Sequence, residues 1–268
     1  SLFLCLLEEL DDESSLRLLE ALMFLIQTLL FHFSFLNIIK RIKKKQVFLQ
    51  VQSWMVYNHI MNRYFFLFLW GGFAFLSFVL FSYTVHKDFF TQFDFNTTVR
   101  LQDNISRSFD SFFSFLSDIG AFEVSLGFLL VVLVLLRKVR GIFALGFFGL
   151  FHLIELYGKF FVDHLPPPEF MLRTQKIINF PQFHIRAENS YPSGHAGRAA
   201  FLTVILGVIV MRSKKLSHSQ KLIIISILAL YDISMFISRI YLGEHWATDV
   251  IGGALLGLSF GLLATLKI

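Results

Sequence analysis

A histidine and an aspartate near the C-terminus have the spacing of a reactive pair. His245 and Asp249 are four residues apart, so on a helix they share one face and their side chains can touch. An aspartate that accepts the proton of one imidazole nitrogen orients the ring and leaves the other nitrogen free to attack. A second histidine, His195, closes the segment Pro192–His195 (PSGH). These residues predict catalysis by a nucleophilic histidine.

Positive charge and backbone N–H groups accompany the two histidines. Ser193 and Gly194 stand where an apolar helix is expected to begin, and the free N–H groups of a helix N-terminus favour an anion. Lys159 and Arg239 add two cations, and arginine can bind phosphate oxygens with two parallel hydrogen bonds. Cys5 is the sole cysteine, which excludes a cysteine-rich metal cluster. The set indicates phosphoryl transfer through a phosphohistidine rather than a metal-dependent hydrolase.

The elements that must position these residues are strongly apolar. Of 268 residues, 55% are hydrophobic and only 16% are charged, whereas soluble domains carry about 25% charged residues. This composition excludes a disordered chain and disfavours a soluble enzyme. The net charge of +5 comes from 24 Lys and Arg against 19 Asp and Glu, and the basic excess lies in short loops between apolar runs. That placement indicates a membrane protein and no nucleic-acid partner.

Six apolar runs approach the length of a membrane-spanning helix, which needs about 20 residues. The runs cover residues 64–83, 119–136, 141–158, 195–211, 222–237 and 245–266. The predicted fold is all-α, a polytopic membrane bundle with six core transmembrane helices. Ionisable residues inside such runs usually face the bundle interior, and we expect Arg198 and Asp232, in the fourth and fifth runs, to pair.

The basic residues predict the orientation of the bundle. They are Lys40, Arg41, Lys43, Lys44, Lys45 and Arg63 before the first run, Arg137, Lys138 and Arg140 between the second and third, and Arg212, Lys214, Lys215 and Lys221 between the fourth and fifth. A chain that crosses six times places these loops on one side, which the positive-inside rule makes cytoplasmic. Segments 86–120 and 159–193 then face outward. The first should include an amphipathic helix, and His164 in the second is expected to be an exposed loop residue without chemistry.

Residues 1–60 are predicted to form an N-terminal extension before a membrane domain of residues 61–268. Residues 18–39 are apolar enough for an accessory helix that spans the membrane or lies at its interface. The hypothesis that the protein starts at Met55 or at Met61 stays open. No site residue lies in this extension.

The spacing of the polar residues resembles the motifs of the type 2 phosphatidic acid phosphatase superfamily. PSGH at 192–195 matches one motif, and SRIYLGEHWATD at 238–249 matches another throughout. The family's first motif is Lys, six residues, then Arg-Pro. In this sequence Lys159 is followed by FFVDHL and Pro166-Pro167, so Pro166 replaces the arginine. Arg173 or Arg186 is expected to supply the missing charge, Arg173 first.

The resemblance implies a role for each matching residue. His245 would be the nucleophile, Asp249 its orienting partner, and His195 the general acid that protonates the leaving oxygen. The phosphate would be bound by Lys159, Ser193, Gly194 and Arg239. Water would then hydrolyse the phosphoenzyme, and neither a metal nor another cofactor is implied.

The resemblance also implies a function. It predicts a lipid phosphatase of the plasma membrane with an extracytoplasmic site, whose partners are the bilayer and a lipid phosphate such as a polyprenyl diphosphate (undecaprenyl diphosphate), phosphatidate or phosphatidylglycerol phosphate. Two alternatives stay open: a catalytically impaired protein that binds or transports an anionic lipid, and a lipid phosphotransferase. The oligomeric state stays open as well.

Overall fold

A computed structural model describes residues 28, 45–135, 141–175, 177–178 and 188–266. Side chains are described for Thr28 and, within these ranges, from residue 64 onward. The chain divides into two compact units, 1–62 and 63–268. The predicted accessory helix at 18–39 lies outside the described residues except for Thr28, which is helical. Met55 and Met61 fall within the long helix α3. The predicted site residues all lie in the second unit.

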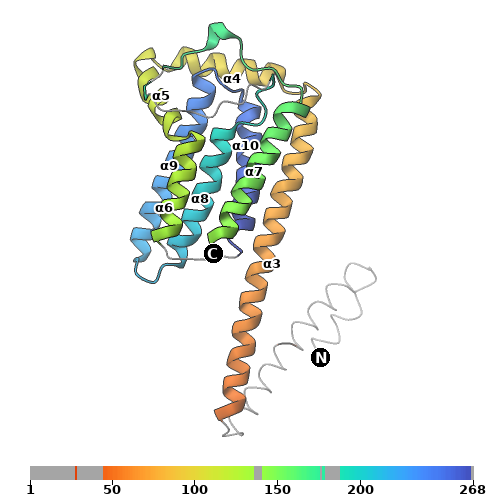
Figure 1. Cartoon of the computed structure of the whole chain (residues 1–268), viewed down its shortest axis with the longest axis vertical. Coiled ribbons are helices and arrows are strands. Elements are labelled where there is room, and N and C mark those ends of the chain that lie inside the picture. Colours follow the sequence, from red (N-terminus) through yellow and green to blue (C-terminus); the bar gives the residue numbers. More distant parts are fainter. Residues whose placement is uncertain (1–27, 29–44, 136–140, 176, 179–187, 267–268) are drawn as a thin grey trace, which may run out of the picture. The chain divides into compact units, whose positions relative to one another are not determined.

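Helices account for the described secondary structure, and the described residues contain no strand (Figure 1). The elements are α3 (Lys45–His86), α4 (Thr91–Asn104), η1 (Arg107–Phe109), α5 (Asp110–Ile119), α6 (Phe122–Leu135), α7 (Ile142–Phe161), η3 (Glu169–Met171), α8 (Gly194–Arg212), α9 (His218–Tyr241) and α10 (Ala247–Ala264). The all-α prediction is confirmed.

Among the described residues, five helices are long and apolar enough to cross a membrane. They are Tyr64–His86 of α3, and α7, α8, α9 and α10. A sixth crossing results if Arg107–Ile119 and Phe122–Leu135, which meet at 54°, count as one span. The predicted run at 119–136 corresponds to the second half of this bent pair. The chain is therefore a multi-pass membrane protein.

Helices α8 and α10 touch through their backbones. A Cβ atom added to Gly257 would lie 2.0 Å from the carbonyl oxygen of Gly197, and one added to Gly253 would lie 2.2 Å from that of Ser193. Small residues allow this close approach between membrane helices. It sets the start of α8 beside the first turn of α10, where the Ser193 N–H donates to the Asp249 carbonyl at 2.9 Å.

Helix α4 lies across one end of the bundle, and α5 lies at the same end (Figure 1). In α4, Asp94 accepts hydrogen bonds from the N–H of Thr248 at 2.9 Å and from its hydroxyl at 2.6 Å, which ties α4 to the first turn of α10. In α5, Phe113 and Leu116 are buried whereas Phe112 and Phe115 are exposed. The amphipathic helix predicted within 86–120 is thus present, and it covers the end of the bundle that carries the polar residues.

The predicted pairing of Arg198 with Asp232 is wrong. The Arg198 Nε donates to the carbonyl of Gly120 at 2.9 Å, and its Nη1 lies 3.8 Å from Glu155 Oε2. Asp232 instead accepts a hydrogen bond from the Thr203 hydroxyl at 2.9 Å. Arg198 therefore faces α7 and the α5–α6 turn, a choice that apolar periodicity within one helix does not reveal.

Candidate active site

A tight turn between α9 and α10 brings Arg239 and His245 together. Gly243 has φ of +69°, a conformation that residues with a side chain rarely adopt. A Cβ atom there would also lie 2.3 Å from the carbonyl oxygen of Met171. Beyond it, the N–H groups of Glu244 and His245 both donate to the Arg239 carbonyl at 3.2 Å. The turn thus fixes the backbone of His245 against the end of α9.

His245 and Asp249 are in contact, as their spacing predicts. Nδ1 of His245 lies 3.3 Å from Oδ2 of Asp249, and the same oxygen accepts the N–H of Trp246 at 2.9 Å. Both side chains are buried. Because the contact uses Nδ1, Nε2 is the nitrogen left for an electrophile.

The surroundings of His245 favour a neutral imidazole. Burial lowers the pKa of His245, and the charges of Arg239 and Lys159 lower it as well. The hydrogen bond and negative charge of Asp249 raise it, but the net pKa lies below the ordinary histidine value. A nucleophilic histidine must be unprotonated at the attacking nitrogen, and this environment meets that need.

The PSGH segment presents donors toward the same place. Ser193 is the extended N-cap of α8, and the helix begins at Gly194. Its first N–H groups have no intrahelical acceptor. The Ser193 hydroxyl is buried and has no hydrogen-bond partner among the described residues. A buried unpaired hydroxyl is costly in a native protein, so the Ser193 hydroxyl is available to hydrogen-bond a ligand.

Arg239 is buried and only partly satisfied. Its guanidinium donates to the hydroxyl of Ser117 on α5 and to the carboxylate of Glu244. Burial raises the pKa of Glu244, but the charge and hydrogen bond of Arg239, the hydrogen bond from Thr174 and the charge of His245 together hold this pKa below its ordinary value. The Nε of Arg239 has no partner among the described residues. A second unpaired donor beside His245 again fits an incoming anion.

Lys159 and His195 complete the group predicted from the sequence. Lys159, in the last turn of α7, donates to the carbonyl of Ser190 at 3.4 Å. His195 lies within electrostatic range of Lys159, Arg239 and His245. The structure therefore gathers the predicted catalytic and phosphate-binding residues at one end of the bundle.

His164 was expected to be an exposed loop residue without chemistry, and that expectation is wrong. Its Nδ1 lies 2.8 Å from Oδ1 of Asp249, and its Nε2 lies 3.6 Å from Oδ2 of Asp94. The side chain is 11% exposed. Burial lowers the pKa of His164, but the hydrogen bonds and charges of Asp249 and Asp94 raise it by more. The net pKa of His164 is about 9. The one feature of the sequence that pointed to a role for His164 was its position between Lys159 and Pro166, inside the first motif.

The model of the PAP2 superfamily matches residues 125–268, more than half of the chain. The chain belongs to the PAP2 superfamily. Phosphatidylglycerophosphatase B of Bacillus subtilis is 35% identical over 69 residues, which cover 26% of this chain and 34% of that protein. The match thus spans about a third of the length of this relative.

Two solved structures share the PAP2 fold. The transmembrane PAP2-type phosphatidylglycerolphosphate phosphatase from Bacillus subtilis superposes with a TM-score of 0.61 at 22% identity, covering 73% of this chain and 94% of that one. Aquifex aeolicus LpxE superposes with a TM-score of 0.50 at 24% identity, covering 65% of this chain and 94% of that one. The all-α, multi-pass fold expected from the apolar runs is therefore confirmed, with five spanning helices among the described residues, or six if the bent pair is one span.

This PAP2 chain departs from the family pattern at Pro166, which is exposed and brings no charge. Arg173 lies near the site. Its N–H donates to the carbonyl of Leu242 at 2.9 Å, and its guanidinium lies 5.0 Å from the ring centre of Tyr241. Its Nη1 is buried without a partner among the described residues. Arg186, the other candidate, lies outside the described residues.

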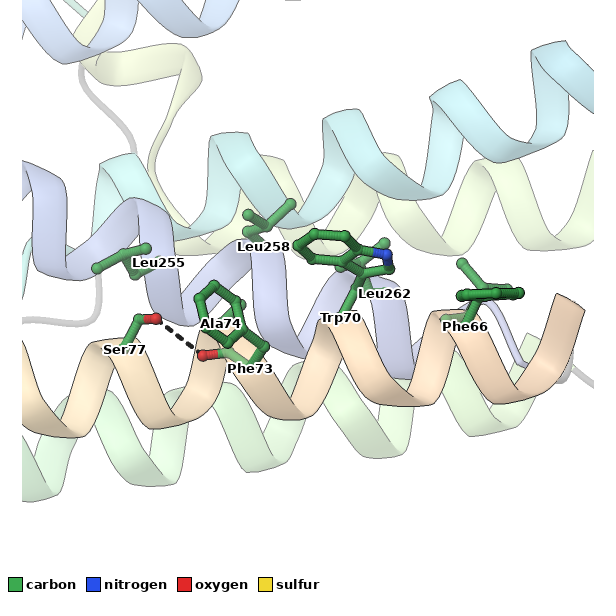
Figure 2. A pocket seen from close by; sticks show the side chains of 9 residues that line it. Phe66, Trp70, Phe73, Ala74, Ser77, Leu255, Leu258 and Leu262 are labelled. Carbon is green, nitrogen blue, oxygen red and sulfur yellow. Dashed lines mark hydrogen bonds between the residues drawn. The ribbon is translucent and has the colours of Figure 1, made fainter. Parts of the chain in front are cut away.

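A cavity of about 410 Å³ elsewhere in this PAP2 bundle is apolar (Figure 2). It lies between α3 and α10 and is lined by Phe66, Leu67, Trp70, Phe73, Ala74, Ser77, Leu255, Leu258 and Leu262. Its lining on α10 begins six residues beyond Asp249, which places it deeper along the helix than the polar cluster. It contains no titratable group, so it cannot do the chemistry.

Within the described part of the chain, no three His, Cys, Asp or Glu side chains form a group that could hold a metal ion. The acidic and imidazole groups at the site contact one another instead. Independence from metal ions remains a prediction about this PAP2 protein.

Proposed function

We propose that the chain is an integral membrane lipid phosphatase, which hydrolyses a phosphomonoester or diphosphate of a lipid at the extracytoplasmic face of the plasma membrane. The observation that carries the proposal is the pair of buried donors, Ser193 Oγ and Arg239 Nε, which have no partner among the described residues and lie beside a buried His245–Asp249 pair. A tetrahedral phosphate offers acceptor oxygens to both donors, and a neighbouring imidazole can attack its phosphorus.

In the first step, Nε2 of His245 attacks phosphorus and forms an N–P bond while the bond from phosphorus to the lipid oxygen breaks. His195 gives its proton to that leaving oxygen. Asp249 holds Nδ1–H of His245, so it orients the ring and stabilises the positive charge that develops on it. Lys159 and Arg239 offset the negative charge of the transferring phosphoryl group.

In the second step, water attacks phosphorus and the N–P bond breaks, which releases inorganic phosphate and restores His245. His195, now neutral, accepts the proton of the water. The free N–H groups at the start of α8, at Gly194 and beyond, bind the phosphoryl oxygens in both steps. The step needs no metal, because positive side chains and N–H groups supply the charge stabilisation.

The position of the site supports a lipid as substrate. It lies at the end of helices apolar enough to cross a membrane, so a lipid tail can stay in the bilayer while its headgroup reaches His245. The matched Bacillus subtilis relative is named a phosphatidylglycerophosphatase. Candidate substrates are therefore phosphatidylglycerol phosphate, phosphatidate and undecaprenyl diphosphate.

The test is release of inorganic phosphate by the purified protein in detergent with EDTA, from each of these three lipids. We expect release that EDTA does not reduce, with His245→Ala as the inactive control. The ranking of the lipids assigns the substrate. If added divalent metal were required, the metal-independent mechanism would be wrong.

Pro166 favours one second candidate, a protein that binds or transports an anionic lipid with an impaired site, because the exposed proline brings no positive charge to the phosphate. The same assay separates the two. A folded protein that binds the lipids but releases phosphate from none of them would favour binding over hydrolysis.

Arg173 is predicted to supply the charge that Pro166 lacks. Arg173→Ala should raise KM for the lipid phosphate by about tenfold to hundredfold, because a charge-assisted hydrogen bond contributes roughly 1.5–3 kcal/mol. Arg100→Ala, which removes an exposed arginine from α4, is the matched control and should leave KM unchanged. Unaltered kinetics in Arg173→Ala would refute this role.

A further inference from the structure

The feature that the proposed mechanism leaves unused is His164, a histidine with an 11% exposed side chain between two buried aspartates. Asp94 comes from α4 and Asp249 from α10, while His164 follows the end of α7. Both ring nitrogens face carboxylate oxygens, at 2.8 Å for Asp249 and 3.6 Å for Asp94. Only a doubly protonated imidazole presents a proton to both, so the geometry favours the cation.

The two oxygens of Asp249 have separate partners. Oδ1 faces Nδ1 of His164 at 2.8 Å, and Oδ2 faces Nδ1 of His245 at 3.3 Å. A carboxylate with one free oxygen can rotate about its last bond, whereas a carboxylate held at both oxygens cannot do so without breaking a contact. The Trp246 N–H also donates to Oδ2 at 2.9 Å, so this contact and the 2.8 Å contact of His164 with Oδ1 together set the plane of the carboxylate.

We infer that His164 is a positioning residue, which as a cation between Asp94 and Asp249 fixes the Asp249 carboxylate so that its other oxygen holds the ring of His245. This inference rests on the proposed function, because it assigns the nucleophile to His245. His164 does not touch the phosphate and acts through Asp249.

The rest of the surroundings holds His164 in place. Its N–H donates to Oδ1 of Asn189 at 2.9 Å, and its carbonyl accepts the N–H of Ser190 at 2.9 Å. The ring meets that of Tyr191 edge to face, with centroids 6.4 Å apart. Lys159 on α7 brings a further positive charge to the site, and it acts on Asp249.

The charge of His164 has a consequence for His245. It offsets part of the negative charge of Asp249, which favours the protonated form of His245. The raised pKa of His164, about 9, keeps this cation present throughout the neutral range. Loss of the cation should therefore raise the pKa of His245 and move the acid limb of kcat/KM to higher pH.

The test compares His164→Gln, which is neutral, with His164→Lys, which keeps a positive charge. His164→Gln should lower kcat about tenfold to hundredfold with little change in KM, and move the acid limb upward by about one pH unit. His164→Lys should keep the wild-type acid limb. The matched control is His86→Gln, since His86 lies 3.7 Å from Asp163 at the same end of the bundle.

A folded His164→Gln with wild-type kcat and an unmoved acid limb would overturn the inference. If that variant does not fold, NMR of the wild type labelled with ¹⁵N-histidine decides: a ring protonated on both nitrogens at pH 8 supports the inference, and its absence refutes it. Wild-type protein that releases no phosphate would refute the proposed function instead, and the NMR result would then stand alone.

Discussion

His245→Ala is expected to lower kcat for phosphate release by about 10⁴-fold, because the variant lacks the atom that forms the N–P bond. The remaining donors, Ser193 and Arg239, stay in place, so KM for the lipid phosphate should change little. The measurement is phosphate release at saturating lipid, with folding checked by thermal unfolding in detergent. His218→Ala is the matched control, since His218 is an exposed histidine at the start of α9.

The pH profile of the wild type checks the same assignment. His245 must be neutral to attack, and its pKa lies below the ordinary value because of burial and the charges of Arg239 and Lys159. Activity should therefore persist below pH 6.5, the ordinary histidine pKa, and fall only at lower pH.

Residual phosphate release in His245→Ala near the wild-type rate would exclude His245 as the nucleophile.

Arg239→Lys is expected to lower kcat/KM by about 10²- to 10³-fold, although the charge is kept. Lysine cannot reproduce the planar fork that contacts Ser117 and Glu244 and leaves Nε for the phosphate. The inhibition constant for inorganic phosphate should rise as well, since the product uses the same donors. Both constants are measured from phosphate release at several lipid and phosphate concentrations.

The control for this substitution is Arg107→Lys, which changes an exposed arginine of η1 outside the site. It should leave both constants unchanged. Because Arg239 is buried, the unfolding temperature of Arg239→Lys must be measured beside its kinetics. A stable variant with kinetics close to wild type would exclude Arg239 from phosphate binding.

The parts of this protein that were predictable from the sequence depend on local spacing. Apolar runs near the thickness of a bilayer are helices because an unpaired backbone is too costly in lipid. The contact of His245 with Asp249 follows from four residues on one helix. The bend between α5 and α6 was not predicted, and the apolar run expected at 119–136 covers only the second helix of the bent pair.

The parts that were not predictable depend on contacts between distant segments. His164 is 85 residues from Asp249 in the sequence, and Asp94 is 154 residues from Thr248. Neither pairing produces a periodic pattern in the sequence. From its sequence, the polar loop that contains His164 therefore resembles any exposed loop. Arg198 likewise had several acidic residues within reach, and only the packing of α7 against α8 selects Glu155 over Asp232.

The contact between α8 and α10 has a consequence for how this site responds to its surroundings. Residues of the proposed site lie at the start of both helices. Ser193 and His195 are at the start of α8, and Asp249 is at the start of α10. Because Gly197 and Gly257 allow backbone to meet backbone, no side chain is present there to change rotamer and vary the separation. The alignment of the two halves is thus built into the main chain, and a change of bilayer composition should alter how often a lipid arrives without altering the geometry that it meets.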